Sequence, residues 1–507
     1  MTTSTEPLLT PQATAALRDA LLLYGYTRDG IVTRIGLEAA QALNRYDPEP
    51  ALRLLGADDP LGVLIRMFMC GHSVPIAHVE EAFVPLLEPA GEGVVRAAVY
   101  LHPYEKWWVV SDFPLFLRPD AQDRRADRVL PIGPTATLLR RAMLGHRVGS
   151  ALDLGTGCGV QALHLSDRAE SVVATDLSQR AARFAATTAA LNGLEWEVLE
   201  GDMTQPVAGR RFDLVVSNPP YAVGPGTVHC LYRDSGRSGD GLCAELVAAA
   251  PELLTEGGHL QFRANWAHVA GEDWRERVAR WIPAGGGLDA WIVQRGTSDP
   301  RAYVDHWLEQ SGGEEHLGQR ETWLRWFDER KITGVGTGTV VLRRTDRRDP
   351  VVRTEELSPE AAELTGAQVA DWFARQDWLR DHDPLASRFR PGVGVRLWQE
   401  AALRPEGDAA SAARGWQLKQ QLLWTPADGL NWNDRTTPLA VALLGASGRD
   451  EQTLGEHLTR LAEAEGTDRS RLVLAALPEV ARLVERGALV PEGLMPREPV
   501  AKGETGP

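Results

Sequence analysis

Apolar residues recur at three- and four-residue spacing in the first quarter of the chain, which is the pattern of amphipathic helices. The spacing is clearest over residues 13–23 and 36–43. Two runs rich in β-branched and aromatic residues follow at 94–101 and 107–112, and the short segment between them is typical of a hairpin turn. We therefore expect residues 1–128 to form a mainly helical domain with a β-hairpin.

From residue 129 onward, short β-branched runs alternate with helical stretches. This alternation is typical of a parallel sheet wound with helices on both faces. Two helical segments are expected at 300–310 and 318–330, shortly before the last strand. The prediction for residues 129–345 is an α/β domain with a seven-stranded, Rossmann-like sheet. The seven expected strands are 151–154, 171–175, 196–199, 212–217, 259–263, 288–294 and 339–343.

The remainder of the chain, residues 346–507, has a mixed pattern. We expect a helix over 358–378, two strand-like runs over 395–401 and 416–423, and further helices that end with 477–486. Helices combined with a hairpin predict a separate α+β accessory domain of winged-helix-like type. Two roles are open for this domain, namely substrate recognition and a stabilising cap.

Composition restricts the class of protein. The 507 residues carry a formal net charge of -15, which weakens any general affinity for nucleic acid. The four cysteines form no close pair and the histidines show no ligand spacing, so we expect neither disulfides nor a metal. No stretch fits a membrane span or an export signal. These features predict a cytoplasmic protein, and they set no oligomeric state.

A glycine-rich loop follows the first strand of the α/β domain. Glycines between a strand and a helix let the backbone approach a ligand closely. A plain tight turn and a dinucleotide site are alternatives, because both also use glycines here. The candidate cofactor contacts in this loop are Asp153, Gly155, Thr156, Gly157 and Gly159.

Acidic residues end the next two strands. Asp176, followed by Leu177, is placed to accept both ribose hydroxyls of an adenosine ligand. Asp202 is placed to accept the amino hydrogens of adenine, and Met203 to cover the ring. A helix N-cap and a surface loop are the structural alternatives for the two carboxylates. Three such signals at three successive strand ends favour an adenosine cofactor.

The fourth strand runs into Asn218-Pro219-Pro220-Tyr221. The two prolines force an extended, rigid loop and lack backbone N–H donors, so fewer N–H groups of the loop compete for its acceptors. An amide or aromatic amino nitrogen has a delocalised lone pair, which must be directed at a methyl group before it can attack. The Asn218 side-chain oxygen and the Pro219 carbonyl are placed to accept its N–H groups, and Tyr221 to stack on its plane. A simple proline stop leaves Asn218 and Tyr221 unexplained.

Together these segments resemble the successive motifs of class I S-adenosylmethionine-dependent methyltransferases. Residues 129–296 resemble the small-domain group, which includes glutamine and ribosomal-RNA guanine enzymes, and the whole chain resembles actinobacterial methyltransferases of this length. The resemblance implies that the glycine loop borders the methionine half of the cofactor, Asp176 the ribose and Asp202 the adenine, with Asn218 beside them. Residues 132–137 depart from the Arg-Pro-Glu-Thr-Glu stretch of the release-factor enzymes, so no glutamate contact is expected there.

The expected function is S-adenosylmethionine-dependent methyl transfer to a planar nitrogen, preferably a glutamine-like amide of a protein or peptide. One alternative acceptor is the exocyclic amine of adenine or guanine in RNA or DNA. Another alternative is a cofactor-binding regulator with vestigial catalysis. Residues 231–241 resemble the stretch after the loop in glutamine enzymes, where Arg233 or Arg237 is a candidate to hold a carboxylate or phosphate. An ordinary solvated loop is equally compatible.

Overall fold

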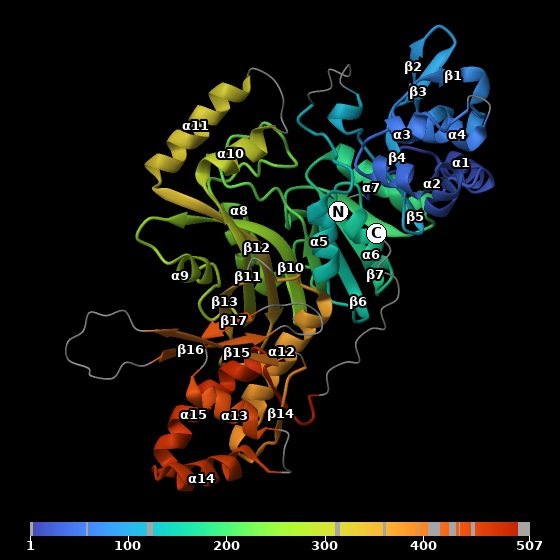
Figure 1. Ribbon diagram of the computed structural model, residues 1–507. Coiled ribbons are helices and arrows are strands. Elements are labelled where there is room, and N and C mark those ends of the chain that lie inside the picture. The colour runs from blue at the N-terminus through green and yellow to red at the C-terminus, as the bar shows by residue number, and fades with distance from the viewer. Residues whose placement is uncertain are drawn as a thin grey trace. The chain divides into compact units, whose positions relative to one another are not determined.

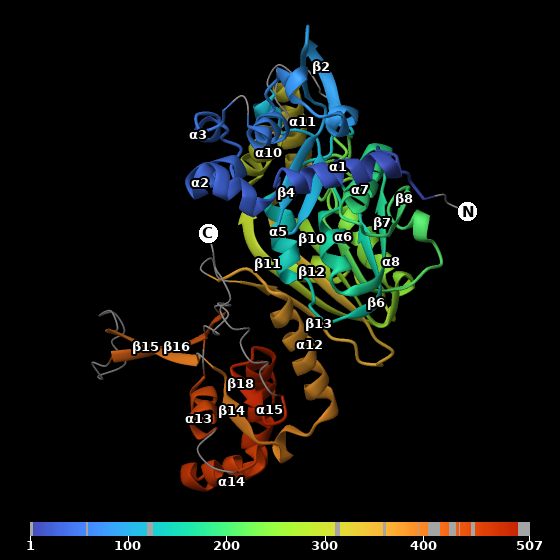
Figure 2. The ribbon, with the colours of Figure 1, turned by 90° about the vertical axis from the view of Figure 1, so that its right-hand side faces the viewer.

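The computed structural model describes residues 4–56, 59–118, 125–309, 315–357, 361–393, 395–403, 416–424, 432–435, 437–447 and 452–494 (Figures 1 and 2). It contains two compact units, one of residues 1–140 with 146–355 and one of residues 141–145 with 356–507. None of the described helices has the length and hydropathy that crossing a lipid bilayer requires.

A mixed eight-stranded sheet forms the centre of the first unit. The strands β8, β7, β6, β9 and β10 run parallel, and β12 is antiparallel to both β10 and β11. All seven expected strands form and β13 adds an eighth at the edge, so the α/β, Rossmann-like class is confirmed. The spatial order is β13 (Val352–Glu356), β11 (Leu288–Ser298), β12 (Ile332–Arg344), β10 (Leu254–Val269), β9 (Phe212–Ser217), β6 (Val148–Leu154), β7 (Ala169–Asp176) and β8 (Trp196–Glu200).

The strand order reverses at β6, which pairs with β7 on one side and with β9 on the other. Leu154, at the end of β6, lies opposite Thr175 of β7 and Ser217 of β9. In open α/β sheets, ligands bind outside the carboxyl ends of the strands at such a reversal. The glycine loop, Asp176, Asp202 and the Asn218 loop follow the carboxyl ends of β6, β7, β8 and β9 in turn.

Helices pack on this sheet, and two more are inserted along the chain between β11 and β12. Right-handed crossovers place α6 and α7 on one face and α8 on the other. Leu246 and Val247 of α8 are fully buried in the core that includes Leu152 and Val215. The helices are α5 (Pro134–Ala142), α6 (Val160–Ser166), α7 (Gln179–Leu191), α8 (Gly241–Leu253), α9 (Trp274–Ala279), α10 (Pro300–Glu309) and α11 (Glu315–Glu329).

The N-terminal region packs on α6 and α7 through a continuous hydrophobic core that includes Leu17, Phe68, Leu163 and Phe184. Its sheet order is β1-β3-β2. The elements are α1 (Pro11–Leu23), α2 (Arg28–Asn44), α3 (Glu49–Leu52), α4 (Pro60–Leu64), β1 (Val74–Pro75), β2 (Leu87–Gly91), β3 (Val94–Ala97) and the hairpin β4 (Tyr100–Tyr104) with β5 (Trp107–Ser111).

The hairpin differs from the expected one in its first strand. Residues 94–97 pair with β2, and only residues 100–104 pair with β5. Glu105, with a φ of 51°, lies in the tight turn. The expectation was wrong because the apolar run over 94–101 contains no glycine or proline that would mark the break between β3 and β4.

The second unit combines helices with short strands. Its first long helix, α12 (Gly366–Asp381), begins later than expected because Thr365 caps it: the Thr365 side chain accepts the Gln368 N–H, and the Gln368 side chain accepts the Thr365 N–H. Of the expected helical residues, 358–360 lie outside the described part and 361–365 are not helical. The remaining elements are β14 (Phe389–Pro391), β15 (Val395–Leu403), β16 (Trp416–Trp424), β17 (Trp432–Arg435), α13 (Pro438–Ala446), α14 (Leu454–Glu465), α15 (Arg469–Glu485) and β18 (Leu489–Pro491).

Candidate active site

The glycine loop between β6 and α6 leaves space for a ligand. Gly155, Gly157 and Gly159 have φ angles of 74°, 56° and 85°, a region that favours glycine. A Cβ added at Gly155 or Gly157 would meet no atom within 4 Å, whereas one at Gly159 would lie 2.8 Å from the Trp196 ring. The first two glycines therefore border open space, and the third permits close packing against β8.

Asp153 stabilises the glycine loop through hydrogen bonds to the loop and to the start of α6. Its Oδ2 accepts hydrogen bonds from the Thr156 hydroxyl at 2.7 Å and from the Ala162 N–H at 3.0 Å. The carboxyl group is buried, and burial raises its pKa to about 7. Asp153 and Thr156 thus bond to each other, and a direct contact of either residue with a cofactor stays a prediction.

The raised pKa of Asp153 predicts a pH dependence of stability. Because the folded protein disfavours the ionised carboxyl, this group lowers the free energy of unfolding as pH rises from about 4 toward 7. We expect Asp153→Asn to remove that contribution, which is on the order of a few kcal/mol at about 1.4 kcal/mol per pKa unit. The melting temperature of the variant should fall less than that of the wild type between pH 5 and pH 8. Asp19→Asn, on the exposed face of α1, is the control; equal slopes for wild type and Asp153→Asn would contradict the assignment.

Asp176, at the end of β7, keeps acceptor capacity on both carboxylate oxygens. Oδ2 accepts the Gly157 N–H at 2.9 Å and Oδ1 accepts the Ser178 N–H at 2.9 Å. Each oxygen retains a lone pair, so the group can still accept two hydroxyl donors. Burial raises the pKa of Asp176, and the backbone N–H groups oppose that rise. The neighbouring Leu177 is 51% exposed, which leaves an apolar surface beside the carboxylate.

A cavity of about 270 Å³ lies at the start of α7, close in the chain to Asp176. It presents both polar and apolar side chains, as ligand sites do. The lining residues are Leu8, Asp127, Ser178, Gln179, Arg180, Arg183 and Leu231. None of the candidate cofactor or reaction-loop residues is among them, so this cavity is not assigned to the cofactor.

Asp202 lies beside Asp176 because Gly201 ties the two strand ends together. The Gly201 N–H donates to the Asp176 backbone carbonyl at 2.9 Å. The Asp202 carboxylate is bound by Arg237, whose Nη2 lies 2.8 Å from Oδ2 and whose Nη1 lies 3.3 Å from Oδ1. Arg237 also pairs with Glu245 of α8 at 3.0 Å. Met203 has a φ of 46°, an uncommon conformation for a residue with a side chain.

The reaction loop begins where β9 ends. The Ser217 hydroxyl donates to the Leu154 carbonyl at 2.7 Å, which fixes the end of β9 against the end of β6. Pro219 is buried, and Pro220 and Tyr221 are partly exposed. The first residue of the loop is therefore anchored next to the glycine loop, which places the two candidate regions side by side.

Asn218 carries the most informative feature of the loop. Its Oδ1 is buried and has no hydrogen-bond partner among the described residues, while its Nδ2 donates to the Thr135 hydroxyl at 3.4 Å. A buried acceptor without a partner is costly and calls for an explanation, of which a bound ligand is one. Thr135 thus directs the amide so that its oxygen is left for a ligand.

Tyr221 extends the site with an aromatic surface. Its ring centroid lies 6.0 Å from that of Trp307, at an interplanar angle of 76°. Burial raises the pKa of the Tyr221 phenol, and the positive charge of Arg263 and the Thr135 side chain partly offset that rise. Tyr221 therefore belongs to an aromatic wall that includes α10.

Two contributors to the site have no signal in the sequence motifs. Thr135 lies in the stretch that departs from the release-factor pattern, and Trp307 lies in a helix inserted between strands. Arg237, one of the two candidate anion holders, reaches Asp202 across 35 positions of sequence. Arg233, a candidate anion holder, is fully buried and paired with Asp234 at 2.6 Å. That pairing makes Arg233 a structural residue, and Arg237 is likewise engaged by two carboxylates.

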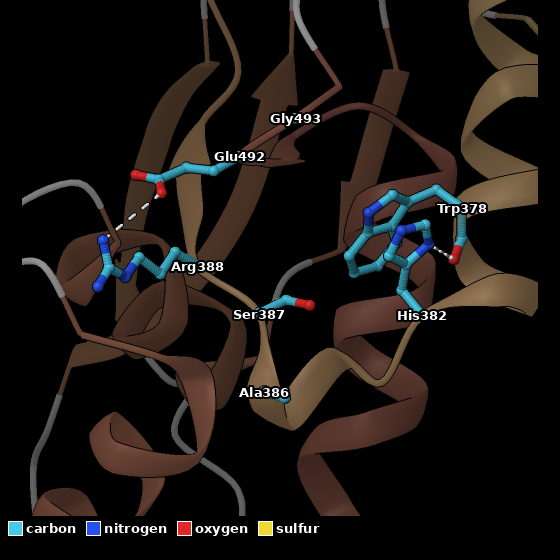
Figure 3. Close-up of a pocket in the computed structure, with 7 residues that line it drawn as sticks. All are labelled: Trp378, His382, Ala386, Ser387, Arg388, Glu492 and Gly493. Atoms are coloured by element: carbon cyan, nitrogen blue, oxygen red, sulfur yellow. Dashed lines mark hydrogen bonds and ion pairs between the residues drawn. The ribbon is translucent and has the colours of Figure 1, made fainter.

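The C-terminal unit has an open cavity of its own, of about 440 Å³ (Figure 3). The His382 ring stacks on Trp378 with centroids 5.1 Å apart and an interplanar angle of 6°. Arg388 and Glu492 form an ion pair at 4.0 Å on another part of its lining. None of the candidate cofactor or reaction-loop residues lies in this unit. Among the described residues, no cluster of three or more His, Cys, Asp or Glu side chains is arranged to hold a metal.

Comparison with known proteins covers three segments of the chain. Residues 132–273 match the family model described as the methyltransferase small domain. Residues 24–99 and 370–491 match two domains of unknown function, DUF7059 and DUF7782. The release factor glutamine methyltransferase of Xylella fastidiosa (strain 9a5c) is 34% identical over 248 residues, which are 45% of this chain and 82% of the relative.

A second relative is the ribosomal RNA small subunit methyltransferase C of Alcanivorax borkumensis. It is 32% identical over 133 residues, which are 26% of this chain and only 37% of that relative. Among solved structures, a ribosomal protein L11 methylase from Lactobacillus delbrueckii subsp. bulgaricus is 19% identical with a TM-score of 0.24 over 42% of this chain and 77% of its own. So weak a structural likeness carries no information on function.

The fold, the strand-end residues and the relatives define a class I methyltransferase. The chain belongs to the small-domain methyltransferase family. It is an S-adenosylmethionine-dependent enzyme, and S-adenosylmethionine is its cofactor. The free lone pairs of Asp176 and the open space at Gly155 and Gly157 fit that group.

Proposed function

We propose that this enzyme methylates a planar nitrogen, and that its acceptor is a glutamine-like amide of a protein or peptide. The observation that carries the proposal is the buried Oδ1 of Asn218, which has no hydrogen-bond partner among the described residues. It lies at a strand end beside the glycine loop, where an acceptor N–H would satisfy it. Nucleophilic oxygen or sulfur acceptors would offer no comparable pair of N–H donors.

The residues of the loop have distinct parts in this reaction. When bound, S-adenosylmethionine supplies an electrophilic methyl group on a sulfonium. Asn218 Oδ1 and the Pro219 carbonyl each accept one N–H of the substrate, which aims the nitrogen lone pair at that methyl and stabilises the charge that develops. A nitrogen–carbon bond forms as the sulfur–carbon bond breaks, and the acidified nitrogen releases its proton to water. No side chain need act as a base.

The cofactor contacts follow from the strand ends. We propose that Asp176 accepts the two ribose hydroxyls, that Leu177 and Met203 border the adenine, and that Asp202 accepts its amino hydrogens. The backbone of the loop from Gly155 to Gly159 would border the methionine half. The Gly157 and Ser178 N–H groups each occupy one lone pair on an Asp176 oxygen, and the ribose hydroxyls would use a second lone pair on each oxygen.

Two observations favour an amide over a nucleobase. The relative that is covered over 82% of its length is named for a release-factor glutamine, whereas the ribosomal-RNA relative is covered over 37%. The net charge of -15 also opposes a polyanionic substrate. The nucleobase amine remains the alternative acceptor. A cofactor-binding regulator with vestigial catalysis is disfavoured, because the Asn218 loop is intact and the Asn218 Oδ1 has no hydrogen-bond partner among the described residues.

We also propose that the C-terminal residues form an accessory domain for substrate recognition. Because β13 pairs with β11 in the central sheet, this domain begins after residue 355 and not at the expected residue 346. In the described part, α14 and α15 are joined by only three residues, and Gly466 adopts a left-handed conformation at the end of α14. Two helices joined by a short glycine-containing turn are typical of a helix-turn-helix. This arrangement supports a winged-helix-like module.

The acceptor class can be tested by labelling. The enzyme and methyl-labelled S-adenosylmethionine are incubated separately with the protein and the nucleic-acid fractions of a cell extract, with Asn218→Ala as the control. We expect label in the protein fraction, and none above background with the variant. Label confined to nucleic acid would overturn the amide proposal while keeping the planar nitrogen.

Arg237 provides a further prediction about cofactor binding. Its guanidinium holds Asp202 in place, and the pair is only partly buried, so its energetic contribution is modest. We expect Arg237→Ala to raise the S-adenosylmethionine Kd about threefold in isothermal titration, because Asp202 loses its fixed orientation. Arg280→Ala, which removes an exposed ion pair with Glu272, should leave the Kd unchanged. Tighter binding in Arg237→Ala would show instead that the guanidinium competes with the adenine.

A further inference from the structure

Helix α10 reaches the reaction loop through one buried hydroxyl. Tyr303 is 4% exposed, and its Oη accepts the Val223 N–H at 2.8 Å and the Asn265 Nδ2–H at 2.9 Å. Val223 is two residues beyond Tyr221, so this hydrogen bond fixes the backbone immediately after the reaction loop. The Trp307 side chain, one turn along α10, also hydrogen-bonds to the same hydroxyl.

Asn265, which donates to the Tyr303 hydroxyl, is itself held in place by the central sheet. Asn265, on β10, is 2% exposed, and its Oδ1 accepts the Thr337 hydroxyl at 3.0 Å. Thr337 lies directly opposite Asn265 in the antiparallel ladder of β10 and β12. The chain of hydrogen bonds therefore runs from two core strands through Asn265 and Tyr303 to the loop backbone.

Packing restricts the next residue of the loop as well. A Cβ at Gly224 would lie 3.0 Å from the Trp323 ring of α11, and Gly224 pairs with Gly239, whose N–H donates to the Gly224 carbonyl at 2.8 Å. Residues 222–224 are thus held by α10, by α11 and by the far end of the following loop. Ala222 and Val223 are both buried in the hydrophobic cluster that includes Tyr303 and Trp323.

We propose that Tyr303 is a positioning residue for methyl transfer, which acts by fixing the distance and orientation of the Asn218 and Pro219 acceptors relative to the cofactor. The inference rests on the proposed function. Tyr303 touches neither acceptor oxygen itself and acts through the Val223 N–H. In-line transfer depends steeply on geometry, and a displacement of about 1 Å can cost about a hundredfold in rate. An anchor directly behind the loop is therefore expected to affect the chemical step more than cofactor binding.

The test compares Tyr303→Phe with Tyr26→Phe. Tyr26 is a matched control, because its fully buried hydroxyl donates to the Leu101 carbonyl at 2.6 Å in the N-terminal core. For Tyr303→Phe we expect at least about tenfold faster hydrogen–deuterium exchange at the Val223 amide. We also expect kcat to fall about tenfold or more when the variant methylates the cell-extract fraction that the wild type labels. The S-adenosylmethionine Kd should stay within about twofold of the wild-type value. Tyr26→Phe should lower the melting temperature without either effect.

Two results would overturn the proposal. One is wild-type kcat and wild-type Val223 exchange in Tyr303→Phe, and the other is an equal fall in kcat in Tyr26→Phe. If Tyr303→Phe does not fold, Thr337→Val can replace it, because this variant removes the hydroxyl that donates to Asn265. We expect smaller changes of the same kind in kcat and in Val223 exchange. Wild-type values of both in Thr337→Val would contradict the positioning role of Tyr303. If Asn218→Ala keeps full activity, the proposed function fails. Hydrogen–deuterium exchange at the Val223 amide of Tyr303→Phe then tests separately whether Tyr303 holds the backbone after the loop.

Discussion

Replacing Asn218 with alanine is expected to lower the rate of methyl transfer by about 10²- to 10³-fold, the usual effect of removing one oriented group from a transition state that develops charge. The physical reason is the loss of the Oδ1 acceptor, which is buried and has no other partner among the described residues. Because the amide makes its described contact with Thr135 and not with the glycine loop, the S-adenosylmethionine Kd should change less than threefold. Single-turnover transfer from labelled cofactor and isothermal titration measure the two quantities.

The matched control for this variant is Asn44→Ala, an exposed asparagine at the end of α2. It should retain wild-type transfer and binding. Asn218→Asp offers a second comparison, since it keeps one acceptor oxygen but loses the donor to Thr135. We expect it to retain more activity than Asn218→Ala. Transfer at the wild-type rate by Asn218→Ala would refute the mechanism.

Replacing Asp176 with alanine is expected to abolish cofactor binding in practice, with a Kd at least about 100-fold higher. Two charge-assisted hydrogen bonds to the ribose would be lost, each of about 1.5–3 kcal/mol. The variant also removes the acceptors of the Gly157 and Ser178 N–H groups, which loosens the glycine loop. Isothermal titration with S-adenosylhomocysteine, which lacks the sulfonium charge, isolates the ribose contribution.

Asp176→Asn is the conservative comparison. It keeps the shape and one acceptor oxygen, so its Kd should lie between those of the wild type and Asp176→Ala. Asp19→Ala, on the exposed face of α1, should bind as the wild type does. A Kd within threefold of the wild type in Asp176→Ala would show that the ribose lies elsewhere.

The central part of the fold was predictable because local pattern and topology agree. Strands β6 to β9 are short and have buried apolar residues at their centres, and parallel neighbours bring their carboxyl ends to one edge. Asp176 and Asp202, 26 positions apart, therefore had to lie close together. The Asn218 loop follows the adjacent strand on the other side, so the candidate site could be assembled from strand order alone.

The rest depended on contacts that sequence pattern does not encode. Thr135 meets Asn218 across 83 positions and Tyr303 meets Val223 across 80, and neither residue lies in a recognisable motif. Arg237 was one of two candidates to hold a carboxylate or phosphate, and its partners Asp202 and Glu245 became visible only in three dimensions. The break between β3 and β4 falls within an apolar run, because residues 98–99 leave one sheet for another without a glycine or proline.

The identity of the methylated atom distinguishes a planar nitrogen acceptor from every other class of acceptor. The labelled product of the wild-type enzyme can be digested and its methyl group located by tandem mass spectrometry. We expect an N-methyl group on an amide or amino nitrogen, formed by the wild type and absent from the Asn218→Ala reaction. A methyl group on oxygen, sulfur or carbon would contradict the assignment of the Asn218 loop to a planar nitrogen.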